Sequence, residues 1–296
     1  MPEGQRLCLL TVHAHPDDES SKGAGTVAKY HAEGVHTVLV CCTGGEAGDI
    51  LNPAMDTDEV KSDLGAVRRA ELDKATAVIG YDEVVLLGYR DSGMPDSDHN
   101  KHPECFANAE LDEAVGRLVA VIRRTKPQVI VTYHEDQRGY PHPDHIRVHD
   151  VTLPAFDAAA DPDKYPEAGP AWQPLKLYYT SWSRKRMIAM HEKFEEMGIE
   201  SPFGERIGAM REAEAKAPAD PNTTVIDISD YADIRRDALL AHATQIDPTS
   251  PFWFGLPPEV ARTVYPFDDY VLARSLVESD IPEDDLFAGV RESVRN

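Results

Sequence analysis

The chain has 296 residues, of which 42% are hydrophobic, and its formal net charge is -22 at pH 7. This length suits one large α/β domain or one domain with a sizeable appendage, and the hydrophobic content argues against a wholly disordered chain. The negative charge argues against nucleic acid and anionic membrane surfaces as partners, because both are bound through basic patches.

The N-terminal sequence lacks the basic start, apolar core and cleavage site of a signal peptide, and its apolar run over 7–12 is far too short to cross a bilayer. The cysteines, Cys8, Cys41, Cys42 and Cys105, show no CxxC spacing. The first three fall in runs that predict buried strands, where cysteine packs as a small hydrophobic residue. We therefore expect a reduced, cytoplasmic protein that does not span a membrane.

The first polar cluster, HAHPDDES, follows the apolar run over 7–12, which predicts a short buried strand. Residues 23–30 predict the start of a helix, so the cluster lies on a strand-to-helix turn. In an open α/β sheet this is the carboxyl edge, where ligands bind. His15 and Asp18 are three residues apart, so one tight turn can direct both at a divalent ion such as zinc. Asp17 lies between them and is free to act on a water at the metal.

A further loop reaches the same edge of the predicted sheet. Residues 36–42 predict a second strand, and the glycine-rich loop after it matches neither common phosphate-binding pattern. Its glycines are expected to allow close approach to a ligand, which Asp49 could contact. The next helix, predicted over 64–79, carries Arg68 and Arg69 side by side. One of these arginines is expected to face solvent, and the other is available to the ligand.

A third strand is predicted over 83–88, and Asp91 follows its carboxyl end. Asp91 either forms the turn or contacts the ligand, and the sequence leaves both interpretations open. The loop that follows contains His99, His102 and Cys105, which resemble a metal cluster in composition only. Their spacing matches no structural zinc pattern, so we expect a solvent-exposed loop.

The second polar cluster, GYPHPDH, follows an amphipathic helix predicted over 109–124 and a fourth strand predicted over 129–133. Its two histidines, His142 and His145, can meet the first cluster if the two strands are neighbours. Two nitrogen ligands and one oxygen ligand leave a position open for water, as in a catalytic zinc site. Asp144 either caps the following helix or supports the site.

The alternation of strands and helices up to a fifth strand over 176–180 predicts a Rossmann-like, doubly wound, mostly parallel sheet. We assign residues 1–180 to this α/β domain. Residues 181–296 are expected to form a C-terminal capping and substrate-binding region over the active edge, which is not an independent domain. Within this region, 184–215 is predicted to be largely helical and 225–228 to be a short strand.

The AHPDDE run at 14–19 and the HPDH run at 142–145 together resemble the LmbE-like (PIG-L) metal-dependent deacetylases, which remove N-acyl groups from glucosamine-type substrates. The resemblance spans nearly the whole chain and includes TGGEAGDILNPAM at 43–55 and AHATQIDP at 241–248. Within the family, Lys22 and the ILNPAM loop are more similar to members that cleave mycothiol S-conjugates than to members that deacetylate a mycothiol precursor. Lys22 matches a position associated with the preference for substituted thiols.

The resemblance implies a ligand set and a catalytic mechanism. His15, Asp18 and His145 would hold the metal, either Zn²⁺ or Fe²⁺, since the ligand set suits both. Asp17 would be the general base that takes a proton from water. His142 would act as the acid or as the stabiliser of the oxyanion.

The remaining implied roles concern the substrate. Tyr140 would polarise the scissile carbonyl, and Asp144 would orient His142 or a ligand histidine. Arg68, Asp91 and Asp49 match positions that hold sugar and inositol hydroxyls. The expected substrate is therefore a small-molecule thiol conjugate.

The expected reaction is hydrolysis of the amide between glucosamine and N-acetylcysteine, giving a mercapturic acid and glucosaminyl-inositol. One alternative is deacetylation of N-acetylglucosaminyl-inositol in mycothiol biosynthesis, which activity ratios on the two substrates would separate. Another is a non-catalytic metal or sugar binder, but such a protein would have no use for Asp17 as a base. The absence of a GxSxG motif excludes the usual serine hydrolase arrangement. The sequence does not indicate an oligomeric state.

Overall fold

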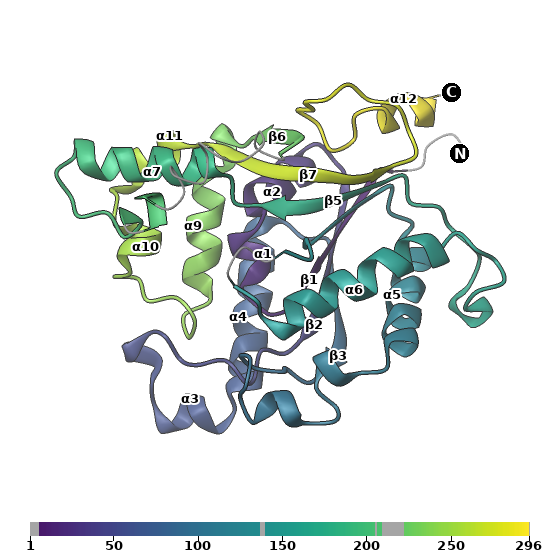
Figure 1. The fold of residues 1–296 in the computed structure, drawn as a ribbon, viewed down its shortest axis with the longest axis horizontal. Coiled ribbons are helices and arrows are strands. Elements are labelled where there is room, and N and C mark those ends of the chain that lie inside the picture. The colour runs from purple at the N-terminus through teal and green to yellow at the C-terminus, as the bar shows by residue number, and fades with distance from the viewer. Residues whose placement is uncertain (1–5, 137–139, 205, 209–221, 296) are drawn as a thin grey trace.

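A computed structural model describes residues 6–136, 140–204, 206–208 and 222–295. Their strands form a seven-stranded sheet in the order β3-β2-β1-β4-β5-β7-β6 (Figure 1). The first five of these run parallel, β7 pairs antiparallel with β5, and β6 pairs antiparallel with β7. The strands are β1 (Cys8–His13), β2 (His36–Thr43), β3 (Glu83–Tyr89), β4 (Val129–Thr132), β5 (Lys176–Ser181), β6 (Thr224–Asp227) and β7 (Phe267–Ser275).

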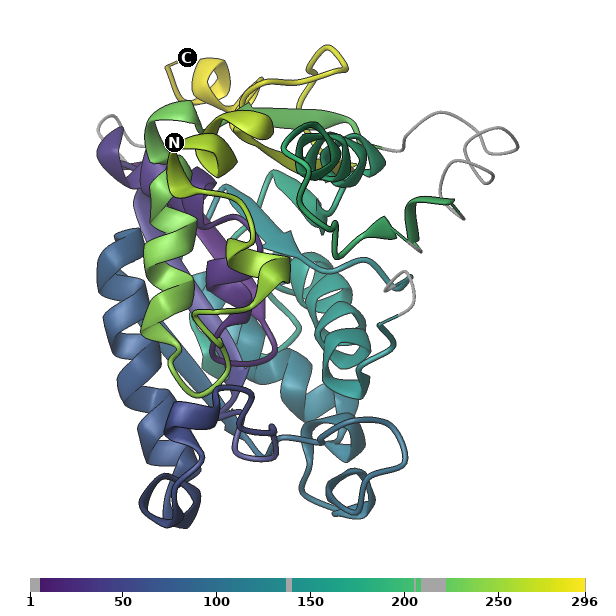
Figure 2. The same ribbon diagram turned by 90° about the vertical axis from the view of Figure 1, so that its left-hand side faces the viewer.

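Helices cover both faces of this sheet, which confirms the predicted doubly wound α/β fold (Figure 2). The helices are α1 (Asp18–Ser21), α2 (Ala24–Ala32), α3 (Asp58–Ser62), α4 (Leu64–Ile79), α5 (Leu111–Thr125), α6 (Pro143–Ala158), α7 (Arg184–Glu196), α9 (Ala232–Ala241), α10 (Pro251–Phe254), α11 (Pro258–Val264) and α12 (Val290–Arg295). None of the helices in the described residues is both long enough and apolar enough to span a membrane.

The core lies on the two faces of the sheet because successive strand residues point to opposite sides. On one face, Leu10 of β1 joins Leu118 of α5 and Val148 of α6 in a single hydrophobic cluster. On the other face, Leu9 joins Val27 of α2 in a second cluster, to which α4 and α9 also contribute. Burial on both sides explains why the central strands are continuous apolar runs rather than alternating ones.

The structure differs from the sequence expectations in two places that bear on the site. Helix α6 begins at Pro143 rather than at 146, so His142 becomes its N-cap. Strand β7 was not predicted, because Asp268 and Asp269 interrupt the apolar pattern near its start. Both carboxylates are buried, and Asp268 accepts hydrogen bonds from the hydroxyl and backbone amide of Thr26 and from Arg235.

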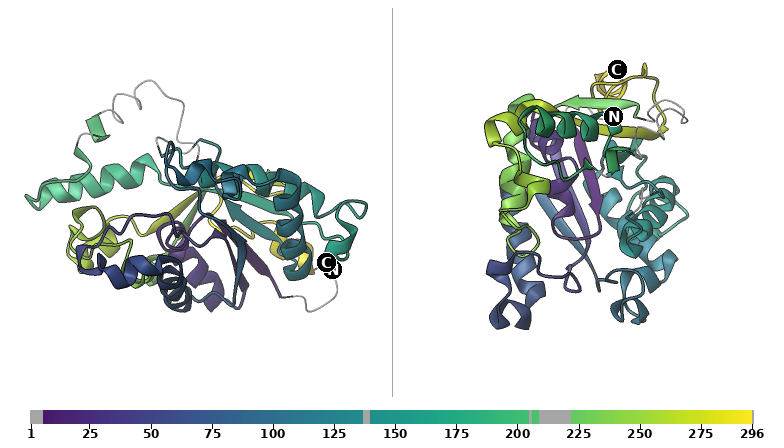
Figure 3. Two further views of the ribbon diagram at one scale, coloured as in Figure 1. Left: turned by 90° about the horizontal axis from the view of Figure 1, so that it is seen from below. Right: turned by 60° about the vertical axis from the view of Figure 1, so that its left-hand side comes forward.

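The region after residue 181 adds β6 and β7 to the same sheet, and β6 confirms the predicted short strand. Helices α7, α10 and α11 lie beside α9 at one end of the molecule (Figure 1, Figure 3). Of the segment 184–215, which was predicted to be largely helical, Arg184–Glu196 forms α7, whereas 197–203 is not helical. Residue 205 and the part from 209 onwards lie outside the described residues. The division of the chain at residue 180 remains a prediction.

Candidate metal centre and catalytic site

The turn after β1 and the first turn of α6 bring the three predicted metal ligands together. Asp18 Oδ2 lies 3.5 Å from His15 Nδ1 and 3.3 Å from His145 Nε2. All three side chains are buried. They meet because β1 and β4, which deliver the two polar clusters, are neighbours in the sheet. The three residues form a group that is able to hold a metal ion.

The two donor–donor distances at Asp18 suit a tetrahedral zinc ion, and all three donor atoms lie within 4.8 Å of one another. Ligand atoms at about 2.0–2.1 Å from such an ion lie roughly 3.3 Å apart. The two nitrogen–oxygen distances at Asp18, 3.5 and 3.3 Å, agree with that spacing. Two nitrogens and one oxygen leave a fourth position for water or substrate, and the same donor set also suits iron(II). A second potential group, His15, Asp91 and His142, shares His15 with the first.

The second ring nitrogen of His15 faces carboxylates behind the site. His15 Nε2 lies 3.1 Å from Asp144 Oδ2 and 3.6 Å from Asp91 Oδ1. Asp144 is itself held by Ser92, whose hydroxyl and backbone amide both donate to it. A carboxylate behind a ligand imidazole fixes its tautomer and its orientation. Of the two predicted partners of Asp144, this geometry favours the ligand histidine over His142.

Asp17 has a positive φ of 117°, a conformation that costs a non-glycine residue about 1–3 kcal/mol. Two contacts hold it there. Its backbone amide donates to Glu19 Oε2 at 2.9 Å, and Arg68 donates to its Oδ2 at 2.8 Å. Arg68 also donates to the carbonyl of Pro16 and, at 2.5 Å, to that of Gly45. Burial raises the pKa of Asp17, and the charge of Arg68 opposes this rise.

His142 caps α6 through its side chain. His142 Nδ1 accepts a hydrogen bond from the backbone amide of Asp144 at 3.2 Å, so the proton of the neutral ring is on Nε2. Burial and the positive charges of His15 and His145 lower the pKa of His142 to about 4. At neutral pH the ring is therefore a neutral hydrogen-bond donor at Nε2, and its centroid is 4.5 Å from that of His15.

Tyr140 is the most exposed of the predicted catalytic residues, with 51% of its surface accessible. Its ring centroid lies 5.5 Å from that of His145 and 6.0 Å from that of His142. Its hydroxyl is 3.8 Å from Met94 Sδ. Tyr140 thus borders the candidate metal centre from the solvent side. Gly139, which belongs to the same sequence motif, lies outside the described residues.

The predicted substrate-binding residues are placed differently from one another. Lys22 Nζ forms an ion pair with Asp18 Oδ1 and lies 5.5 Å from the centre of the Tyr133 ring. Asp91 is buried beside His15. Asp49 is exposed, and its backbone carbonyl accepts a hydrogen bond from Gln245.

The two adjacent arginines of α4 lie in different environments. Arg68 is buried and directed at Asp17, and its side chain is only 3% exposed. Arg69 is exposed and forms an ion pair with Asp73 at 3.0 Å. Arg68 is therefore the arginine at the site, and its contact with substrate hydroxyls remains a prediction.

The partners in two buried hydrogen bonds near the site were not anticipated from the sequence, although His13 was expected to be a packed or hydrogen-bonded structural residue. His242, the C-cap of α9, has Nε2 2.6 Å from Glu19 Oε1, and both side chains are fully buried. His13 Nδ1 lies 2.8 Å from the hydroxyl of Tyr133. No spacing rule connects these pairs. The only sequence signal for His242 is its place in the AHATQIDP segment.

Comparisons with known proteins place this geometry in context. The sequence pattern of the PIG-L family, described as GlcNAc-PI de-N-acetylase, matches residues 10–156. A mycothiol S-conjugate amidase of Streptomyces coelicolor is 48% identical over 97% of this chain and 99% of its own. A 1D-myo-inositol 2-acetamido-2-deoxy-alpha-D-glucopyranoside deacetylase of Geodermatophilus obscurus is 40% identical over 95% of this chain and 97% of its own. Among solved structures, an N,N'-diacetylchitobiose deacetylase from Pyrococcus horikoshii has the same fold, with a TM-score of 0.60, 17% identity and coverage of 90% of this chain and 83% of its own.

Proposed function

The chain belongs to the PIG-L family of amide-hydrolysing enzymes, and we propose that it is a metal-dependent amidase acting on mycothiol S-conjugates. It would cleave the amide between glucosamine and N-acetylcysteine and release a mercapturic acid and glucosaminyl-inositol. The main support for amide hydrolysis is the buried group of three potential metal ligands, His15, Asp18 and His145, with Asp17 beside it. The choice of substrate is supported by the 48% identity to the amidase, against 40% to the biosynthetic deacetylase.

We expect His15, Asp18 and His145 to hold the metal ion, either zinc or iron(II). A bound divalent ion would polarise the scissile carbonyl and lower the pKa of water to about 7. The chain supplies the orientation of this site: Asp144 fixes the ring of His15 from behind, and Ser92 fixes Asp144. The expected place of action is the cytoplasm, where thiols are kept reduced.

Asp17 is the proposed general base that takes a proton from the attacking water. Its Oδ2 is occupied by Arg68, whereas no hydrogen bond to Oδ1 is found among the described residues. Oδ1 is therefore the oxygen left for the water. Burial raises the pKa of Asp17, which brings a carboxylate closer to the pKa that suits a base at neutral pH.

His142 is proposed to donate its Nε2 proton as a hydrogen bond to the oxyanion that forms during attack. The neutral state of its ring at pH 7 favours this role over that of an acid. One such donor typically contributes about 10²–10³-fold to the rate. Tyr140 would polarise the same carbonyl from the solvent side, which agrees with its exposed position beside His142. Lys22, Arg68, Asp91 and Asp49 would contact the remaining groups of the substrate.

The experiment that tests the proposal compares two substrates on the metal-loaded protein. Hydrolysis of a mycothiol–bimane conjugate is measured beside deacetylation of N-acetylglucosaminyl-inositol. We expect faster cleavage of the conjugate and loss of both reactions after treatment with a chelator. Faster deacetylation would instead assign the protein to mycothiol biosynthesis, with the same site and a different substrate.

A further inference from the structure

A cavity of about 150 Å³ lies among helices α7, α9, α10 and α11, away from the candidate metal centre. Its lining is mostly apolar, and it also includes charged residues: Arg186, Asp233, Arg235, Arg236 and Arg262. Figure 1 shows these four helices together at one end of the molecule. Its wall includes Trp182, Phe203, Phe252, Trp253 and Met190. The rings of Trp182 and Phe252 are nearly parallel, at 11°, with centroids 5.8 Å apart. We call this space the aromatic cavity. Its lining suits a flat or branched apolar group.

A second cavity, of only about 10 Å³, lies between the aromatic cavity and Lys22. It is lined by Ser21 and Lys22 on one side and by Trp182 and Arg186 on the other. Trp182 and Arg186 line both cavities, so these two side chains form a shared wall. Lys22 in turn reaches the proposed ligand Asp18 with its Nζ. Trp182, Arg186 and Lys22 therefore lie between the aromatic cavity and Asp18.

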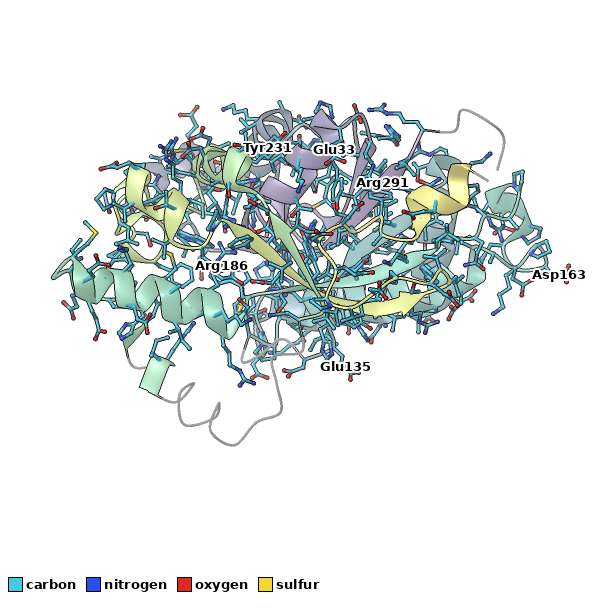
Figure 4. All side chains as sticks on the ribbon, turned by 90° about the horizontal axis from the view of Figure 1, so that it is seen from above. Glu33, Glu135, Asp163, Arg186, Tyr231 and Arg291 are labelled. Carbon is cyan, nitrogen blue, oxygen red and sulfur yellow. The ribbon has the colours of Figure 1, made fainter. Side chains whose placement is uncertain are left out.

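Arg186, in this shared wall, is weakly paired. Its guanidinium lies 4.7 Å above the Trp182 ring, and within the described part of the chain its ion pair is a long contact of 3.9 Å to Asp268. Asp268 Oδ1 is already bound by Arg235. Figure 4 shows Arg186 between α7 and the strands β6 and β7. Its guanidinium therefore keeps donors for an acceptor on a bound molecule, such as an amide carbonyl.

We propose that the aromatic cavity binds the S-substituent of the thiol conjugate and that Arg186 donates a hydrogen bond to an acceptor near the sulfur. This inference rests on the proposed function. In an S-conjugate the sulfur is only three bonds from the scissile carbonyl, so its substituent begins close to the site; the proposal requires that it passes Lys22, which lines the small cavity. An acetylated sugar has only a methyl group on that side of its amide and gives the cavity nothing to bind. The preferred substrates are therefore conjugates with apolar, preferably aromatic, substituents.

The test fills the aromatic cavity by enlarging a side chain of its wall. The control is the same substitution at an exposed residue of the same helix. Ala261 of α11 lines the cavity, whereas Thr263 on the same helix is exposed and is not part of the wall. The readout is the ratio of kcat/KM for the bimane conjugate to kcat/KM for the S-methyl conjugate. We expect A261L to lower this ratio roughly 10-fold, since each methylene-sized group excluded from an apolar site costs roughly 4-fold in affinity. T263L is expected to leave the ratio unchanged.

A direct binding measurement supplements the kinetic test. Trp182 and Trp253, two of the three tryptophans of the chain, line the cavity, so N-acetyl-S-benzylcysteine should change the tryptophan fluorescence in a saturable way. The fluorescence change on binding should be smaller in A261L and unaltered in T263L. Where A261L melts well below the wild type, Phe252→Ala replaces it. This substitution removes a ring of the wall and is expected to lower the ratio as well.

The outcomes separate the two proposals. A wild-type protein that cleaves no S-conjugate overturns the proposed function, and the assignment of the cavity fails with it. A wild-type protein that cleaves both conjugates, with a ratio that neither A261L nor Phe252→Ala changes, overturns the assignment of the cavity alone. A lowered ratio with weakened binding in A261L supports it.

Discussion

His242 Nε2 lies 2.6 Å from Glu19 Oε1, although 223 residues separate the two in the chain. Both side chains are fully buried behind the turn that carries Asp17. The other oxygen of Glu19 accepts the backbone amide of Asp17 at 2.9 Å. The C-terminal end of α9 therefore holds the carboxylate that in turn holds the backbone of the proposed base. This connection matters because Asp17 has a positive φ of 117° and relies on its contacts to keep it.

Replacement of His242 by alanine is expected to impair catalysis without removing the metal. The buried Glu19 carboxylate would lose its histidine partner, and breaking a buried ion pair in this way costs about 3–5 kcal/mol of folding stability. The turn at Asp17 would loosen, and a misplacement of that kind lowers kcat by roughly 10- to 100-fold. The measurement is kcat and KM at saturating metal, together with metal content and melting temperature.

Two variants control for a purely structural effect of this substitution. His242→Gln keeps a donor for Glu19 and should recover part of kcat. His191→Ala removes another buried histidine, whose partner Ser201 is remote from the site, and should leave kcat unchanged. A His242→Ala protein with wild-type kcat would show that the Glu19–His242 pair does not position Asp17.

Substitution of Asp17 and of His145 should separate turnover from metal binding. Asp17→Asn is chosen because asparagine tolerates a positive φ better than alanine. It should keep the full metal content and lose about 10²–10⁴-fold in kcat, the usual contribution of a general base. His145→Ala removes a proposed ligand and should bind less metal after dialysis. Metal analysis and kinetics on the same samples check both. Undiminished turnover by Asp17→Asn would exclude Asp17 as the base.

The positions of the two polar clusters at strand ends could be predicted because they depend on short stretches of sequence. An apolar run followed by a polar turn marks a strand end, and the spacing of His15 and Asp18 sets one side of the site. The only long-range condition, that β1 and β4 are neighbours, is confirmed by their pairing through Leu9–Thr11. The parallel part of the fold followed from the alternation of strands and helices in the same way.

Other features could not be predicted because tertiary packing decides them. Helical spacing alone does not say which of Arg68 and Arg69 faces the site. Arg68 is buried because α4 packs against the turn that carries Asp17. His142 caps α6 because the helix begins at Pro143, and the predicted start at 146 gave His142 no such role. Strand β7 was missed because its buried aspartates are paired with residues far away in the chain, such as Arg235.

Lys22 should influence the choice between the two substrates. Its Nζ is paired with Asp18, and the residue also lines the small cavity beside Trp182. Lys22→Ala is expected to change the ratio of conjugate cleavage to sugar deacetylation by roughly 10-fold, which corresponds to one hydrogen bond to a charged group. Lys29→Ala is the matched control, since Lys29 binds the carbonyl of Asp227 outside the site. An unchanged ratio in Lys22→Ala would exclude the predicted specificity role.

Asp285 gives the C-terminal segment a stability that depends on pH. It accepts hydrogen bonds from Tyr30 at 2.8 Å, from the backbone amide of Phe287 at 2.9 Å and from Arg291 Nε at 2.7 Å. Partial burial alone would raise the pKa of Asp285, but the hydrogen bonds from Arg291, Phe287 and Tyr30 and the charge of Arg291 lower it below the usual 3.8.

Because the folded state lowers this pKa, the stabilisation is fully present above the unfolded value of 3.8 and is lost as pH falls through the folded one. Asp285→Asn should therefore melt below the wild type at pH 7 and at pH 5, and the difference should shrink below about pH 4. Thermal melts of both proteins across this range check the sign. Asp284→Asn, at the exposed neighbouring residue, should melt like the wild type throughout. A difference between Asp285→Asn and the wild type that grows as the pH falls would contradict the assigned contacts, because protonation of Asp285 removes the charge that Arg291 stabilises.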